Sequence, residues 1–195
     1  MEKIVVSDTN IFIDLISVNL LDGFFSLPWE IHTTDMIIKE LKDSNQKALV
    51  DAHRQRGCLK VSAFTGNEML ELVQMRKQAQ LSSNASIQDC SVWKLAKNLG
   101  CSLLTGDNRL RKVAQKDNVE VHGILYLFDK MLEHQVINHE TAIARLQSLF
   151  SINSRLPKDE IDKRLELWEA ALNQQEDTNE DIKNERSEKS HQSAN

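Results

Sequence analysis

Four acidic residues lie at or near expected boundaries between strands and helices. Asp8 follows the apolar run at 3–7, and Asp107 follows the short strand at 101–105. Asp89 is in the first turn of a helix after the loop 81–86, and Glu40 is on the helix after the second strand. Ligands bind in open α/β sheets at the carboxyl ends of the strands. We therefore expect the four carboxylates to converge on one crevice.

Carboxylates brought that close repel one another unless a cation lies between them. Hard oxygen ligands suit Mg²⁺ or Mn²⁺ and do not suit zinc. Each acid also has a simpler explanation. Asp8 and Asp107 are good helix N-caps, Asp89 would interact favourably with a helix dipole, and glutamates such as Glu40 are common on solvated helix faces. Only the combination of the four points to a metal site.

Strands and helices alternate along the chain that positions these acids. Strand-like runs occupy 3–7, 29–34, 58–64, 101–105 and 118–123, with helical patterns between them, the first running from Asn10 to Gly23. Parallel strands joined by helices require crossover connections. The sequence predicts an α/β three-layer sandwich with a mostly parallel central sheet, plus C-terminal helices.

With 195 residues, 41% of them hydrophobic, the chain is expected to hold one main domain at 1–150. A helical extension follows at 151–173, where Trp168 stands at helical spacing with Leu165 and Leu172. The segment 174–195 carries six acids and three bases, and its polar composition predicts a disordered tail. Removing this −3 from the net charge of −5 leaves −2, which does not exclude a substrate that carries phosphate.

Several other classes of function lack their signatures. The three cysteines form no C-x-x-C pair, no G-x-S-x-G motif is present, and the six histidines show no metal-ligand spacing. No apolar run of about 18 residues and no signal peptide is visible, so a cytoplasmic protein without a membrane span is expected.

Order, spacing and flanking residues together resemble a known family. The blocks are VVSDTNIFIDL, Glu40 in IIKEL, Asp89 in SIQDCSVWKLAKNLG, and Asp107 in CSLLTGDNRLRKVA. They look like the four acidic blocks of PIN domains over roughly residues 3–150. The segment NSRLPKDEIDKRL resembles the helical extension of bacterial toxin-like members, of the VapC type. Glu40 is placed by distance and helix context, and Asp35 and Asp43 are alternatives to it.

The resemblance implies a metal-dependent endoribonuclease. Asp8, Glu40, Asp89 and Asp107 would bind Mg²⁺ or Mn²⁺, and a metal-activated water would hydrolyse an RNA phosphodiester bond. Asn10 and Thr105 match positions where the family often has a small polar residue that orients an acid or a water. Besides RNA, the resemblance implies two partners: a small antitoxin protein and a second copy of the chain.

Basic residues follow the last acid directly. Arg109, Arg111 and Lys112 could position an RNA backbone, although a solvated helix face explains them equally simply.

Two other functions are alternatives, and the sequence argues against the first. An aspartyl-nucleophile phosphatase would use Asp8, but it normally needs a second acid two residues later, where this chain has Asn10. A catalytically weak PIN-like scaffold that binds RNA or a protein partner would keep the fold without the activity.

Overall fold

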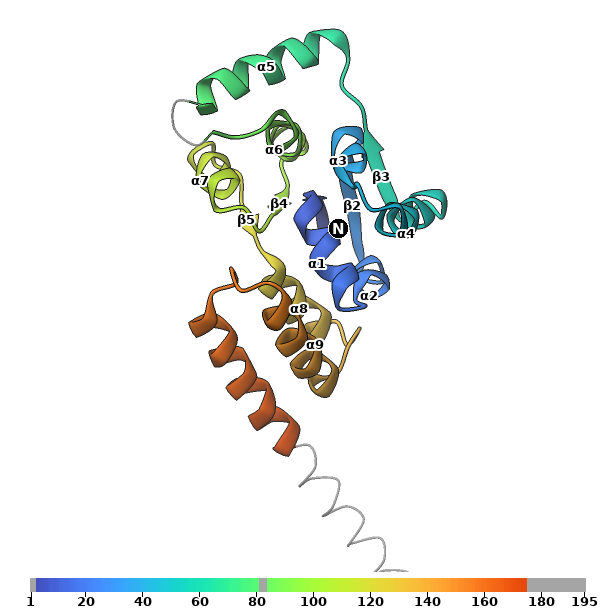
Figure 1. Ribbon diagram of the computed structural model, residues 1–195, viewed down its shortest axis with the longest axis vertical. Coiled ribbons are helices and arrows are strands. Elements are labelled where there is room, and N and C mark those ends of the chain that lie inside the picture. The colour runs from blue at the N-terminus through green and yellow to red at the C-terminus, as the bar shows by residue number, and fades with distance from the viewer. Residues whose placement is uncertain (1–2, 81–83, 175–195) are drawn as a thin grey trace, which may run out of the picture. The chain divides into compact units, whose positions relative to one another are not determined.

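The computed structural model describes residues 3–80 and 84–174 (Figure 1). Contacts divide these residues into two compact units, one up to Val136 and one from Ile137 onward. The boundaries predicted from sequence at 150 and 173 stay predictions. The disordered tail predicted for 174–195 lies outside the described residues except for Gln174.

The first unit is built on a five-stranded parallel sheet with the strand order β3-β2-β1-β4-β5. Its strands are β1 (Lys3–Ser7), β2 (Trp29–Thr34), β3 (Leu59–Ser62), β4 (Ser102–Leu104) and β5 (Val121–His122). Val6 of central β1 is in register with His32 on one side and Leu103 on the other. The five predicted strands and the parallel sheet are confirmed. Asp8 follows β1 and therefore lies at the middle of the carboxyl edge.

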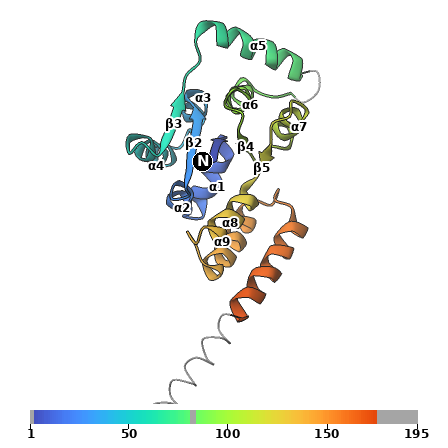
Figure 2. The same cartoon turned by 180° about the vertical axis from the view of Figure 1, so that it is seen from behind.

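Helices connect and cover these strands (Figures 1 and 2). They are α1 (Thr9–Ser17), α2 (Leu21–Phe25), α3 (Asp35–Glu40), α4 (Ser44–Gln55), α5 (Gly66–Gln80), α6 (Ile87–Leu99), α7 (Asn108–Lys116) and α8 (Ile124–Glu133). Helix α6 packs across β1, β2 and β4, whereas α1, α2 and α8 pack against one another. The predicted α/β sandwich is confirmed.

The single helix predicted up to Gly23 is wrong, because the chain turns at Asn19. Asn19 adopts a left-handed conformation with φ 58°, which asparagine tolerates better than most residues. Helix α1 therefore ends at Ser17, and α2 begins at Leu21. Leu20 and Leu21, which follow this turn, are both buried.

Fully buried apolar side chains fix the position of the site. Val5 and Val6 of β1 have no exposed surface, and neither have Leu103 and Leu104 of β4. Phe12 of α1 is also fully buried, with the rings of Phe24 and Phe25 about it at centroid distances of 6.5 and 6.3 Å. Helix α1 is therefore held firmly at the end of β1, and so is the turn that carries Asp8.

The second unit contains α9 (His139–Ile152) and a helix at 158–174. Ile161 and Trp168 are buried on the latter helix, and Leu165 and Leu172 are half-buried on the same stripe. The apolar stripe predicted around Trp168 is confirmed. None of the helices in the described residues is long and apolar enough to cross a membrane.

Replacing Phe12 by alanine should cost about 3–5 kcal/mol of unfolding free energy, because a fully buried ring leaves a cavity. Urea denaturation measures this loss. The control is Leu70→Ala on α5, where the side chain is 64% exposed and the change should stay within about 0.5 kcal/mol. Equal losses in the two variants would contradict the assignment of Phe12 to the core.

Candidate active site

Asp8 combines a structural and a chemical position. Its backbone N–H donates to the carbonyl of Leu104 at 3.0 Å, which extends the β1–β4 pairing to the end of the strand. Its Oδ1 accepts the N–H of Thr9 at 2.7 Å, so the side chain caps α1. Only 4% of the residue is exposed. The apolar strand and the cap together place a carboxylate in a nearly dry position.

The second oxygen of Asp8 is held by the two polar residues predicted beside it. Its Oδ2 accepts the Thr105 hydroxyl at 2.7 Å and the Asn10 amide at 2.9 Å. The Asn10 carbonyl oxygen accepts the N–H of Gly106 at 2.9 Å, and the Thr105 oxygen accepts the N–H of Asp107 at 3.0 Å. These bonds tie Asp8 to the turn that carries Asp107. Asn10 is an amide and cannot supply the second acid that an aspartyl-nucleophile phosphatase needs.

Glu40 reaches the same neighbourhood from α3. Its Oε2 accepts the hydroxyl of Thr9 at 2.5 Å, and Thr9 directly follows Asp8. The two alternative acids are engaged elsewhere: Asp35 pairs with Lys39 at 2.5 Å, and Asp43 caps α4. Glu40 is favoured at the second acidic position because it contacts Thr9 and its charge acts on Asp8.

Asp89 and Asp107 both begin helices. Asp89 forms a capping box with Ser86 at the start of α6, its Oδ2 accepting the Ser86 N–H at 2.7 Å. Asp107 caps α7 by accepting the N–H of Arg109 at 2.6 Å. The cap roles suggested by local sequence are confirmed for Asp8 and Asp107. A capping carboxylate has further lone pairs, so these roles leave room for a second partner.

Electrostatics connect three of the acids. The pKa of Asp8 is raised from 3.8 to about 7: burial is the largest cause, the hydrogen bonds from Thr105 and Thr9 oppose it, and the negative charges of Asp89 and Glu40 add to it. Within residues 3–80 and 84–174, no Lys, Arg or His forms an ion pair with Asp8, Glu40, Asp89 or Asp107. The carboxylates thus share a region that lacks a compensating cation.

The donor set fits a hard divalent cation in chemistry and in charge. In the part of the chain that the structure describes, however, no three His, Cys, Asp or Glu side chains are grouped so that they could hold a metal ion as they stand. The structure brings Glu40 and Asp89 close enough to raise the pKa of Asp8, and it links Asp107 to Asp8 through the Thr105 hydroxyl. Ligation by all four stays a prediction, and it requires these side chains to turn toward a common point.

The basic residues predicted to contact RNA differ in their surroundings. The Arg111 guanidinium donates to the carbonyls of Val121 and Thr105 at 2.8 and 3.3 Å, and burial lowers its pKa. It therefore joins β5 to the end of β4. Arg109 and Lys112 are exposed on α7.

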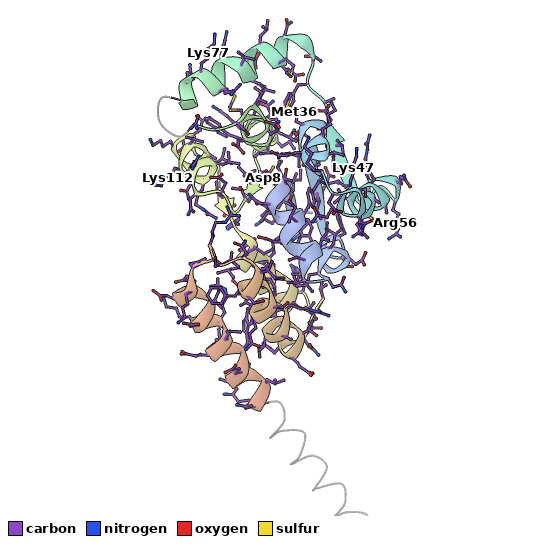
Figure 3. The ribbon with its side chains drawn as sticks, in the orientation of Figure 1. Asp8, Met36, Lys47, Arg56, Lys77 and Lys112 are labelled. Atoms are coloured by element: carbon purple, nitrogen blue, oxygen red, sulfur yellow. The ribbon has the colours of Figure 1, made fainter. Side chains whose placement is uncertain are left out.

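Two further cations went unnoticed in the sequence. Lys42 and Lys47 are exposed, follow Glu40 and Asp43, and have no ion pair among the described residues. Figure 3 shows Asp8, in its view, between Lys112 of α7 and Lys47 of α4. The signal that could have found them is their proximity in sequence to Glu40.

Comparison with known proteins settles the family. A sequence model described as a PIN domain matches residues 4–170, most of the chain. The chain belongs to the PIN domain family. The match extends beyond residue 150 into the helix at 158–174.

Individual relatives of this PIN domain are distant. Endoribonuclease Nob1 from Methanocaldococcus jannaschii is 31% identical over 97 residues, which are 50% of this chain and 47% of the relative. The chain thus spans about half the length of the curated relative that it matches.

Two solved structures match the chain at low similarity. A protein from Pyrobaculum aerophilum has a TM-score of 0.48 and 14% identity, covering 68% of this chain and 99% of its own. A PilT N-terminus domain protein from Sulfolobus solfataricus has a TM-score of 0.41 and 16% identity, covering 67% and 95%.

The burial of Asp8 predicts how stability depends on pH in the presence of chelator. The folded state holds the proton up to about pH 7, while the unfolded chain releases it near 3.8. Stability should therefore fall as pH rises from 4 to 7, by up to about 4 kcal/mol at roughly 1.4 kcal/mol per pKa unit. Asp8→Asn has no titrating group at this position. The free energy of unfolding of this variant, relative to that of the native chain, should therefore increase across this range.

Urea denaturation at pH 4, 5.5, 7 and 8 measures the difference, with the exposed Glu169→Gln as a control that tracks the native chain. A difference between Asp8→Asn and native that stays constant with pH would contradict the burial of an uncompensated charge.

Proposed function

We propose that this PIN domain is a ribonuclease that hydrolyses RNA phosphodiester bonds with Mg²⁺ or Mn²⁺ at Asp8, Glu40, Asp89 and Asp107. The observation that carries the proposal is the nearly dry Asp8 carboxylate beside two further acids, none of which pairs with a cationic side chain in the described part of the chain. An arrangement of this kind costs folding free energy without a cation. It is expected where a divalent ion or a phosphate-bound metal completes the site.

The chain's own residues have distinct tasks in this proposal. Thr105 and Asn10 orient Asp8 through its Oδ2, and Thr9 orients Glu40 through its hydroxyl. The cap of α7 keeps Asp107 at the end of β4. A bound Mg²⁺ or Mn²⁺ would activate the attacking water and neutralise charge on the phosphate. No side chain then needs to act as the nucleophile.

RNA as the substrate is supported by the relative and by the surface. The relative's name says that it is an endoribonuclease, and the match to it covers half of this chain. Exposed cations stand beside two of the acids: Lys42 and Lys47 follow Glu40, and Arg109 and Lys112 follow Asp107. Cations on both sides of the acids suit a strand that continues in both directions from the bond that is cut.

A toxin neutralised by a small antitoxin protein is the finer form of the proposal, and it rests on the toxin-like C-terminal extension. A scaffold with a weak site is the second candidate. It is favoured by the absence, among the described residues, of three acids arranged to hold a metal as they stand.

Cleavage of a mixed single-stranded RNA pool tests the proposal. The native chain should cut with Mg²⁺ or Mn²⁺ and stop with chelator. Asp8→Asn and Asp107→Asn should each lower the rate by about 100-fold or more, since even residues that only orient metal ligands typically cost 10- to 100-fold. Asp117→Asn is the matched control, because Asp117 pairs with Lys97 and should cut as the native chain does. Cutting that survives in both site variants would reject the assigned acids.

The flanking cations should govern affinity separately from chemistry. Two double variants test this: Lys42→Ala/Lys47→Ala and Arg109→Ala/Lys112→Ala. Each should weaken binding of a 12-nucleotide RNA in chelator. Each should also reduce the slope of log K against log salt concentration by about two. Lys39→Ala/Lys60→Ala is the control, because these lysines pair with Asp35 and Glu30. Fluorescence anisotropy at several salt concentrations measures both quantities, and an equal loss in the control pair would speak against a localised RNA path.

A further inference from the structure

A hollow at the other end of the sheet from the acids combines aromatic rings with cations. It has a volume of about 480 Å³ and lies beside Trp29 and Tyr126, with Lys3, Lys130, Glu133 and His134 at its border. Sites for small ligands typically have volumes of about 300–1,000 Å³. Lys3 begins β1 and Trp29 begins β2, so the hollow opens at the amino edge. The proposed catalysis uses none of these residues.

The rings form a short, nearly parallel series. His122 stacks on Tyr126 with centroids 3.8 Å apart and 9° between the planes, and Tyr126 and Trp29 are 6.2 Å apart at 25°. Trp29 and Tyr126 are both half-buried, so part of each side chain remains accessible to solvent. Aromatic side chains that remain accessible in this way are platforms on which nucleobases stack.

The cations supply the chemistry for a phosphate. Lys3 Nζ lies 5.0 Å from the Tyr126 centroid and 5.5 Å from that of Trp29, and it donates to the Tyr126 hydroxyl at 2.6 Å. This hydrogen-bond partner is neutral, and among the described residues Lys3 forms no direct ion pair, although its charge lowers the pKa of Glu120 and Glu133 nearby. Lys130 lies 5.5 Å from the Tyr126 centroid while pairing with Glu133. Lys3 can therefore bind an anion without breaking a direct ion pair, whereas Lys130 would have to share its charge with Glu133.

A purely structural role explains the contacts of Lys3 but not the open hollow. The cation–π contacts of Lys3 do tie β1 to β2 and α8, and this is their structural value. They do not explain why the rings border an open hollow instead of being covered. A planar base beside Trp29 with its phosphate near Lys3 would use both features.

We propose that this hollow binds one nucleotide unit, with the base on Trp29 and the phosphate at Lys3 and Lys130. That this nucleotide belongs to an RNA strand rests on the proposed function. β1 separates Lys3 from Asp8 by five residues, or about 16 Å at roughly 3.3 Å per residue. At about 3.4 Å per nucleotide, a stacked strand that reaches both ends of the sheet has about five nucleotides, and an extended strand needs fewer. The hollow would hold such a strand at a distance from the bond that is cut.

Binding in chelator tests this without any cleavage. A labelled 12-nucleotide single-stranded RNA is titrated by anisotropy against native protein, Trp29→Leu and Lys3→Gln. We expect about 10-fold weaker binding for Trp29→Leu, the size typical of one lost stacking contact. Lys3→Gln should bind several-fold more weakly and lower the salt slope by about one.

Matched controls separate binding from folding. Trp93→Leu removes a tryptophan that packs in the separate apolar cluster around Leu72, and Lys97→Gln removes a lysine paired with Asp117. Both should bind RNA as the native chain does. If Trp29→Leu and Lys3→Gln lose thermal stability but bind RNA like native protein, the hollow is structural and the proposal is overturned.

The source of the nucleotide is decided by adenosine monophosphate as competitor. Displacement of the RNA only at millimolar concentration supports an RNA strand as the ligand, whereas displacement at micromolar concentration supports the same site with a free nucleotide. Asp8→Asn keeps the two proposals apart, since it should stop cleavage and retain the Trp29-dependent binding. Absence of cleavage in native protein would reject the ribonuclease and leave the binding result standing.

Discussion

The burial of one carboxylate, Asp8, at the end of the central strand is the constraint on which the rest of the site depends. Its surroundings are set by β1 and β4, whose apolar residues are fully buried, and by the cap that it forms on α1. Three donors hold its two oxygens, from Thr9, Asn10 and Thr105. A carboxylate can be held this precisely only where the backbone on both sides is fixed, and the parallel β1–β4 pair provides that.

The neighbouring acids are organised around this residue to different degrees. Glu40 is joined to it through the Thr9 hydroxyl, and Asp89 acts on it through space while capping α6. Asp107 is not among the charges that raise the pKa of Asp8, and it is connected to Asp8 through the Thr105 hydroxyl and through the Asn10 side chain, which binds the neighbouring Gly106. A cation would therefore have to compete with two helix caps for the oxygens of Asp89 and Asp107. This competition offers a physical reason why metal binding and helix stability should be coupled here.

The sequence predicted the strands, the parallel sheet and the position of Asp8, because an apolar run of strand length followed by capping residues has few alternative structures. It missed the turn at Asn19, since a left-handed asparagine leaves the apolar spacing of a helix intact. It gave no warning that the Arg111 guanidinium is occupied by two carbonyls, nor that Tyr126 gathers Lys3 and His122 around its ring. Those contacts join residues distant in sequence, and local pattern carries no information about them.

Diffraction from crystals soaked in Mn²⁺ tests the central claim most directly, because manganese scatters anomalously and carboxylate oxygens at a hard divalent ion lie about 2.0–2.2 Å from it. The account predicts an anomalous peak at the Asp8 carboxylate, with Glu40, Asp89 or Asp107 turned toward the same ion, and no such peak in Asp8→Asn. A fully occupied manganese elsewhere with none at Asp8, or a site that persists in Asp8→Asn, would contradict it.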